Sequence, residues 1–497
     1  MQHYMPQIVW HDREGILSVD FHLTVCEKDV EDEDPGKQKS KGNREAQKFP
    51  VTVYKIATAS MQREIRLWEL YFKDGLVVNF VANLAGHNGT TNVVRFSPDG
   101  QMIASGDIDG CVLIWKEFPM EEESRREAQL DDDSSDIPPN KENWGRALRT
   151  PFRHDRDVTN LCWSPDSLMV ASVSMDDSIL CHRVDTGRRV WSVRGFRHFP
   201  NGIVWDPRGK YVVTLSTDRR FDILDALKGT RLRCCHSVDL PTMQLSEEVN
   251  LPRERYKVFH DDQLISFTRT VEFSPCGSVV FAPAAHLEVG AKNVYGTFVF
   301  KRADFDKCRP SAMLQSEKPT IAVKCSPVYY ELRDDVKGNF LGLPYRLVYA
   351  VMTKDAVMVY DSQYSEPFYY IDNMHLNVLT SVSWSPDGKV LAISSMEAYI
   401  SFVTVEHRVI GKVCEKPPVK EEDTMEILPI KKKKDQEKEG GDTPLIVRRK
   451  GHKEEAESST SKIAKTPVQQ ASEGELKENK PKTPQSCQKK LSEFFNC

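Results

Sequence analysis

Apolar and polar residues alternate in three short runs between residues 84 and 116. The runs are separated by turns that contain Pro, Asp and Gly, and they cover residues 93–96, 102–105 and 112–115. A period of two that is broken by such turn residues predicts β-strands rather than helices. One unit of this size cannot bury its own apolar face, so a stable fold requires neighbouring copies that stack on it.

The same stretch is similar to the WD repeat, whose unit is a four-stranded blade of a β-propeller with Gly-His near its start and Trp near its end. The resemblance implies a hydrogen-bonded network of His87, Ser105 and Asp109, with Trp115 beneath it. We interpret His87 and Asp109 as structural rather than catalytic, because a buried carboxylate needs partners and this network supplies them.

Edited copies of the pattern recur, so we predict an all-β fold, a seven-bladed WD40 β-propeller over residues 1–406. Asp176 in the third copy and Asp218 in the fourth occupy the tight turn that Asp109 occupies in the second. The first copy has Gln62 there, and we expect its hydrogen-bond network to be incomplete. In the third copy His182 stands in place of the Trp.

Residues 7–10 predict a lone strand ahead of the first copy. Propellers of this family commonly close when an N-terminal strand completes the last blade, which removes an open sheet edge. Polar insertions are expected near residues 27–49, 117–148 and 226–266, of which the first is too polar to pack.

From residue 407 the composition changes to Lys, Glu, Pro, Ser and Thr, and we expect residues 407–497 to form a disordered tail. Residues 411–497 contain 19 Lys and Arg against 16 Asp and Glu, so the chain's net charge of −5 leaves −8 on the part before them. This balance suits a basic partner better than a phosphate backbone, and we expect no sequence-specific DNA binding. An acidic surface is also common in proteins, so the charge alone names no partner.

The remaining composition limits the possible functions. No apolar run is long enough to cross a bilayer, and the first residues lack the basic start and apolar core of a secretory signal. The 12 Cys include no C-x-x-C pair, which indicates a reduced compartment and argues against a zinc site or a disulfide framework. Phosphate-binding loops and hydrolase motifs are absent from the sequence, so we expect no catalytic residues, no metal and no cofactor.

Four irregular stretches carry a more specific resemblance. They are Ile8-Val9-Trp10-His11, Asn140-Lys141-Glu142-Asn143-Trp144, Phe259-His260-Asp261-Asp262, and Pro327 to Arg333 followed by Leu343-Pro344-Tyr345-Arg346. Their order resembles the WD-repeat middle subunits of chromatin assembly factor one, a histone chaperone complex. The resemblance implies a non-enzymatic nuclear scaffold that assembles nucleosomes during DNA replication and repair. As partners it implies the large and small subunits of that complex and histones H3-H4.

Two motifs in the tail extend this resemblance. Basic residues look like a nuclear-import signal, although a solvated charge run is the alternative interpretation: Lys431, Lys432, Lys433, Lys434, Arg448, Arg449 and Lys450. A second motif resembles the segment through which this family and the HIRA chaperone engage the anti-silencing histone chaperone: Lys462, Ile463, Thr466, Pro467 and Val468. An extended peptide of this type can add to a sheet edge, with its two aliphatic residues as anchors.

The last motif consists of Gln488, Leu491, Phe494 and Phe495. It fits the pattern by which replication proteins resemble one another in binding the sliding clamp. One helical turn places the Leu and both Phe on a common face, a compact apolar plug for a pocket. A chance pair of Phe or a packing anchor is the alternative. In the family, clamp binding is mostly associated with the large subunit, so the motif is a departure here.

Two other functions stay open at this point. A HIRA-like chaperone that works independently of replication belongs to the same class. A substrate receptor of a cullin-type ubiquitin ligase is suggested by Trp205-Asp206-Pro207-Arg208, which fits the W-D-x-R signature of such receptors. That signature belongs at the end of the third strand of a blade, whereas here it follows the first, so we prefer the chaperone.

Overall fold

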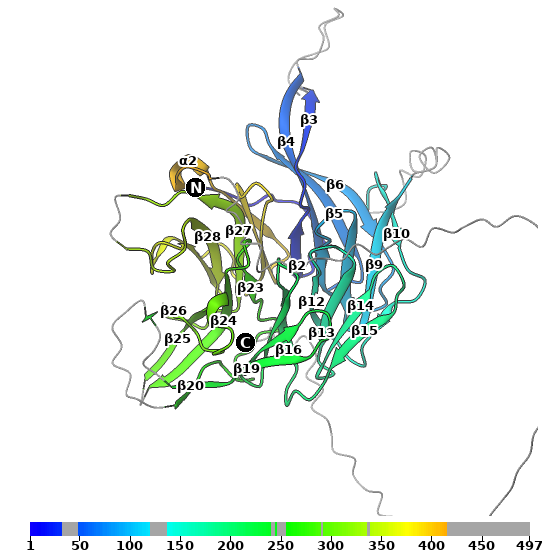
Figure 1. Cartoon of the computed structure of the whole chain (residues 1–497). Coiled ribbons are helices and arrows are strands. Elements are labelled where there is room, and N and C mark those ends of the chain that lie inside the picture. The colour runs from blue at the N-terminus through cyan, green and yellow to red at the C-terminus, as the bar shows by residue number, and fades with distance from the viewer. Residues whose placement is uncertain are drawn as a thin grey trace, which may run out of the picture. The chain divides into compact units, whose positions relative to one another are not determined.

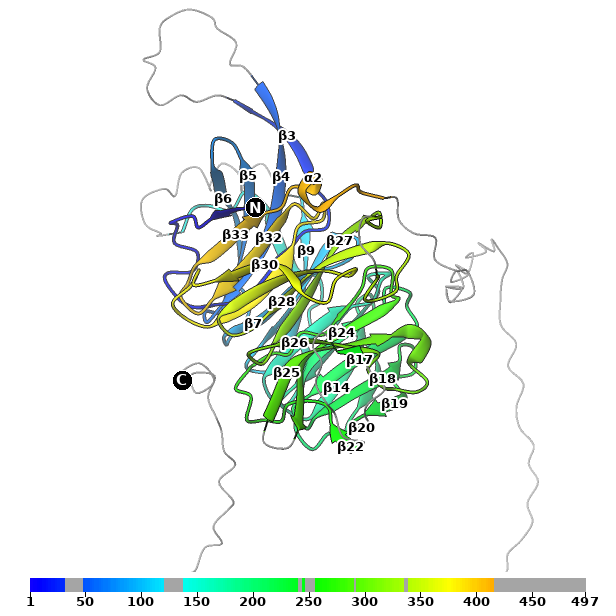
Figure 2. The ribbon, with the colours of Figure 1, turned by 90° about the vertical axis from the view of Figure 1, so that its left-hand side faces the viewer.

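The computed structural model describes residues 1–31, 48–119, 137–239, 244–245, 255–289, 292–334 and 338–414. Over these residues, seven sheets of four or five strands are arranged around a common axis (Figures 1 and 2). The predicted propeller is therefore confirmed. None of the helices in the described part is long and apolar enough to span a membrane.

The first four blades follow one another along the chain. Blade one contains β2 (Ile16–Phe21), β4 (Lys48–Ser60), β5 (Ile65–Phe72) and β6 (Leu76–Leu84), and β3 (Cys26–Glu31) pairs with β4. Blade two contains β7 (Thr91–Phe96), β8 (Met102–Asp107), β9 (Cys111–Phe118), β10 (Asn143–Arg146) and β11 (Phe152–Arg153). Blade three contains β12 (Val158–Trp163), β13 (Met169–Ser174), β14 (Ser178–Arg183) and β15 (Arg189–Val193). Blade four contains β16 (Pro200–Trp205), β17 (Tyr211–Ser216), β18 (Arg220–Asp225) and β19 (Arg231–Cys235).

The last three blades complete the ring. A hairpin of β20 (Ser237–Asp239) and β22 (Arg255–Lys257) precedes blade five. Blade five contains β23 (Glu272–Phe273), β24 (Val279–Val289), β25 (Lys292–Lys301), the 3-10 helix η1 (Arg302–Asp304), β26 (Ala312–Ser316) and the parallel edge strand β21 (Gln244–Leu245). Blade six contains β27 (Ala322–Tyr330), β28 (Arg346–Met352), β29 (Ala356–Asp361) and β30 (Pro367–Asp372). Blade seven contains β31 (Leu379–Trp384), β32 (Val390–Ser395), β33 (Ile400–Thr404) and β1 (Gln2–Tyr4), and α2 (His407–Ile410) follows it.

The ring closes through β1, which pairs antiparallel with β33. The strand expected at residues 7–10 was wrong, because that stretch does not join a sheet. Trp10 is instead fully buried between blades one and seven, where its ring lies 4.9 Å from that of Trp68. The apolar pattern of residues 7–10 therefore reflects burial between two blades rather than strand pairing.

Two of the expected insertions contain the outer strands of blades. β10 lies within residues 117–148 and β19 within residues 226–266. Both strands are largely exposed, so neither carries the apolar alternation that marks an inner strand. The stretch near residues 27–49 begins and ends in the hairpin of β3 and β4, which extends beyond the body of blade one in both views (Figures 1 and 2).

The hydrophobic core is divided among the junctions between blades. In the described part, each of seven apolar clusters combines residues of two neighbouring blades. The cluster between blades one and two, for example, joins Leu67 of β5 to Val94 of β7 and Trp115 of β9. Each blade thus depends on both neighbours for burial, as a repeat protein requires.

Candidate functional site

The hydrogen-bonded network of blade two was predicted with one wrong residue. Trp115 Nε1 donates to Ser105 Oγ at 2.8 Å, and Ser105 Oγ lies 2.6 Å from His87 Nε2. His87 Nδ1 lies 2.8 Å from Asp107 Oδ2, so the acid of the network is Asp107 and not Asp109. Asp107 ends β8, is fully buried and also accepts hydrogen bonds from two amides of the turn, whereas the Asp109 side chain is exposed.

This assignment predicts opposite outcomes for two neighbouring substitutions. Asp107→Ala should lower the free energy of unfolding by about 2–3 kcal/mol, because it leaves the His87 ring and two amides without their acceptor. Asp109→Ala is the matched control and should change it by less than about 0.5 kcal/mol. Urea unfolding followed by tryptophan fluorescence measures both. A larger loss for Asp109→Ala would contradict the network.

Similar networks occur in other blades. In blade three His154 lies 2.9 Å from Ser172 and 3.0 Å from Asp176. In blade four Asp218 accepts hydrogen bonds from Ser216 and from the Arg197 amide. The structure therefore places both predicted turn acids, Asp176 and Asp218, in contacts within their own blades.

The sequence interpretation missed the histidines of three blades. His11, His154 and His375 contact Thr58 in blade one, Ser172 in blade three, and Ser395 and Ser401 in blade seven, respectively. Their common signal is a His four or five residues before an inner strand, as at His87, but none of them follows a Gly. His11 Nδ1 has no hydrogen-bond partner among the described residues, in line with the incomplete network expected where blade one has Gln62.

His182 replaces the Trp of blade three and stacks on Phe152, with ring centroids 4.3 Å apart. Burial, helped by the charges of His154 and Arg189, lowers the pKa of His182 to about 4. The unfolded chain then binds more protons than the folded protein between pH 6.5 and 4. His182 therefore stabilises the fold fully above pH 6.5, and this contribution is lost as the pH falls towards 4.

We expect His182→Phe, which can keep the stacking, to reduce the acid sensitivity of the protein. Between about pH 7 and pH 5 the wild-type protein should lose about 1–2 kcal/mol more unfolding free energy than the variant. Urea unfolding at both pH values measures the difference. Equal losses would mean that His182 does not titrate as its burial requires.

The stretches behind the family resemblance lie where structural elements meet. The Trp10 carbonyl accepts a hydrogen bond of 2.9 Å from Arg66 of β5. Asn140 binds the backbone of β6 in both directions, accepting from Asn83 N at 2.7 Å and donating to Asn83 O at 3.2 Å. Trp144 Nε1 donates to Glu142 at 2.8 Å. These contacts fasten the N-terminal segment and the 137–146 segment to blade one.

The third stretch is held by two arginines. Arg219 of blade four pairs with Asp261 at 2.7 Å. Arg269 is fully buried and donates to the carbonyls of His260, at 2.6 Å, and Asp261. Burial lowers the pKa of Arg269 to about 10. These arginines fasten the segment that leads into blade five.

The fourth stretch captures the chain after blade seven. Arg346 of β28 is 1% exposed and pairs with Asp361 of β29. Its Nε donates to Glu331 O at 2.7 Å and its Nη2 to Ile410 O at 2.9 Å, and the guanidinium lies over Tyr330. We call Arg346, Asp361, Glu331 and Ile410 the exit latch, because they hold α2 against blade six.

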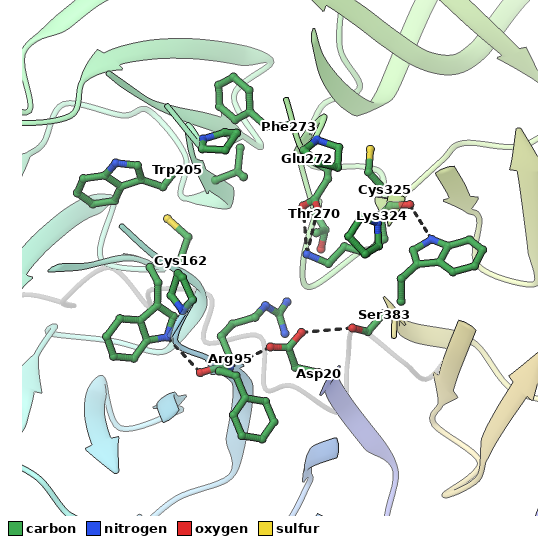
Figure 3. Close-up of a pocket in the computed structure, with 18 of the residues that line it drawn as sticks. Asp20, Arg95, Cys162, Trp205, Thr270, Glu272, Phe273, Lys324, Cys325 and Ser383 are labelled. Atoms are coloured by element: carbon green, nitrogen blue, oxygen red, sulfur yellow. Dashed lines mark hydrogen bonds and ion pairs between the residues drawn. The ribbon is translucent and has the colours of Figure 1, made fainter. Parts of the chain in front are cut away.

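The largest feature with ligand-binding geometry is a cavity of about 470 Å³ at one mouth of the central channel (Figure 3). Seven equivalent positions, one on each inner strand, face it: Asp20, Arg95, Cys162, Val204, Glu272, Lys324 and Ser383. Six prolines from the turns after the inner strands also line it: Pro98, Pro165, Pro207, Pro275, Pro327 and Pro386. At the opposite ends of the inner strands, residues 265–268 leave a space of only about 30 Å³. The cavity is therefore open mainly on the side of the prolines.

Charges in this axial cavity are partly neutralised by one another. Lys324 Nζ lies 3.1 Å from Glu272 Oε2, and burial raises the pKa of Glu272. Asp20 accepts hydrogen bonds from the Phe96 amide at 2.9 Å and from Ser383 Oγ at 3.3 Å. Among the described residues, no group of three or more His, Cys, Asp or Glu could hold a metal ion. The geometry is that of a site for binding a ligand through charge and hydrogen bonds.

The tail motifs lie outside the described residues. This applies to the basic clusters at 431–434 and 448–450, the segment 462–468 and the motif at 488–495.

Fold, blade networks and axial cavity together define a WD-repeat propeller. A family model described as the CAF1B/HIR1 beta-propeller domain matches residues 1–410. The chain is 33% identical over 425 residues to the CAF1B subunit of chromatin assembly factor 1 from Mus musculus, covering 83% of this chain and 68% of that protein. It is 29% identical over 496 residues to the protein of the same name in Saccharomyces cerevisiae, covering 93% and 98%. It is 25% identical over 381 residues to Protein HIR1 of Kluyveromyces lactis, covering 72% and 40%. The chain belongs to the CAF1B/HIR1 β-propeller family.

Proposed function

We propose that the chain is a non-enzymatic scaffold subunit of a nuclear histone H3-H4 chaperone that assembles nucleosomes during DNA replication and repair. The match of the family model to residues 1–410 carries this proposal. It is supported by the relatives named as CAF1B subunits of chromatin assembly factor 1, which the chain covers over more than two thirds of their length.

In this proposal the propeller binds the large subunit, and the complex includes the small subunit. Seven shared cores make the propeller a rigid platform, which suits a scaffold. The exit latch fixes the point from which the C-terminal segment leaves blade six. From there, residues 462–468 contact the anti-silencing histone chaperone and residues 488–495 contact the sliding clamp.

The two alternatives are less well supported. A HIRA-like chaperone fits the relatives named HIR1, but these are 24–25% identical and are covered over 34–44% of their length. A cullin-type receptor would need the W-D-x-R residues to be accessible. Asp206 is fully buried in the turn after β16, where it pairs with Arg302.

A replication extract depleted of the endogenous chaperone tests the proposal. Adding the chain with its large and small partner subunits should restore supercoiling of the replicated plasmid and leave an unreplicated plasmid unchanged. Supercoiling of both plasmids would favour the HIRA-like alternative, and supercoiling of neither would contradict a role in nucleosome assembly.

A further inference from the structure

The polar groups of the axial cavity have unused donors rather than unused acceptors. Asp20 and Glu272 both have partners, as described above. Arg95 uses only Nη1, which donates to Ser18 Oγ at 2.8 Å and Val94 O at 2.7 Å, and no carboxylate of the described residues pairs with it. Figure 3 shows its guanidinium pointing into the cavity beside Asp20. An arginine with a free edge matches the geometry of a carboxylate.

A second donor lies on the next blade. Asn160 lines the cavity and is 2% exposed. Its Oδ1 accepts the Leu161 amide at 2.9 Å, but its Nδ2 has no partner among the described residues. A buried unpaired N–H is costly, so this amide favours a ligand that brings an acceptor.

The described chain ends beside the mouth of this cavity. Residues 412–414 run antiparallel to the end of β27: Lys412 O accepts the Glu331 amide at 2.9 Å and the Cys414 amide donates to Tyr329 O at 3.0 Å. The chain therefore leaves residue 414 in the direction of Pro327, which lines the cavity. At about 3.3 Å per extended residue, a segment some ten residues further on can reach the far side of the cavity.

We propose that the axial cavity binds a peptide carboxylate, and that its resident ligand is the segment 421–428 of this same chain. This segment has four acidic residues, Glu421, Glu422, Asp423 and Glu426, with Met425, Ile427 and Leu428 beside the last. A carboxylate of the segment pairs with Arg95 and accepts from Asn160, and its aliphatic residues meet the prolines of the rim. Attachment at residue 414 gives the segment a high effective concentration at the mouth.

Competition with a synthetic peptide tests both parts of the proposal. The probe is a fluorescein-labelled peptide of residues 419–430, and its binding to full-length chains is followed by fluorescence anisotropy. A chain with E421Q, E422Q, D423N and E426Q should bind the probe at least about tenfold more tightly than the wild-type chain, because its own segment no longer competes. Adding Arg95→Gln to that chain should reduce probe binding at least about tenfold, and Arg194→Gln, at an exposed site in blade three, is the control.

Two further arms keep the test decisive. Asn160→Asp retains the acceptor for the Leu161 amide but replaces the free donor by a carboxylate, so it should also weaken binding if Arg95→Gln fails to fold. A probe with Gln and Asn in place of its acids should not bind. Equal binding of the probe to the wild-type and neutralised chains would overturn the resident segment. Binding of the neutral probe, or unchanged binding to Arg95→Gln, would overturn the carboxylate site.

Discussion

Arg346→Ala is expected to lower the free energy of unfolding by about 3–5 kcal/mol, the largest effect predicted for a single residue of the propeller. Arg346 is almost fully buried, and its loss leaves the Asp361 carboxylate unpaired inside the protein. It also frees the carbonyls of Glu331 and Ile410, so α2 should detach from blade six. Thermal unfolding, together with proteolysis at residues 407–414, measures both consequences.

Two controls separate the buried charge from its surroundings. Lys412→Ala removes an exposed pair with Glu331 in the same segment and should cost less than about 1 kcal/mol. Arg346→Met combined with Asp361→Asn removes both charges and should recover part of the stability. A near-neutral result for Arg346→Ala would contradict the exit latch.

Phe494→Ala with Phe495→Ala is expected to weaken binding to the sliding clamp by about 100-fold or more. Aromatic anchors that fill a pocket commonly contribute about 2 kcal/mol or more each, and about 1.4 kcal/mol corresponds to a tenfold change. The effect should appear as loss of anisotropy when the labelled full-length chain is titrated with purified clamp.

Ser492→Ala with Glu493→Ala is the matched control, because these positions lie between the anchors of the motif. This variant should bind the clamp as the wild-type chain does. Equal binding by the Phe variant, or no binding by the wild-type chain, would refute the motif.

The inner strands of the blades could be predicted because burial imposes a pattern on them. β7 and β31, for example, combine apolar residues with a Ser-Pro turn after the strand. β10 and β19 could not be predicted, since outer strands face solvent and tolerate any polar residue. The stretch at 7–10 was apolar for a different reason, the burial of Trp10 between two blades.

The site residues were predictable only where the repeat is regular. Asp176 occupies the turn position of the WD repeat, but in blade two the acid comes from Asp107, two residues before the expected Asp109. The change of position depends on the backbone of one turn and leaves no trace in composition. The axial cavity was not predicted, because the seven positions that face it come from seven strands and no two of them are adjacent in sequence.

Affinity purification of the tagged full-length chain from replicating cells, followed by mass spectrometry, tests the assignment to a histone chaperone most directly. We predict recovery of the large chaperone subunit and histones H3-H4 with both the wild-type chain and the Phe494→Ala, Phe495→Ala variant, with the sliding clamp reduced in the variant. Recovery of a cullin adaptor without histones would contradict the chaperone function and leave only the propeller fold.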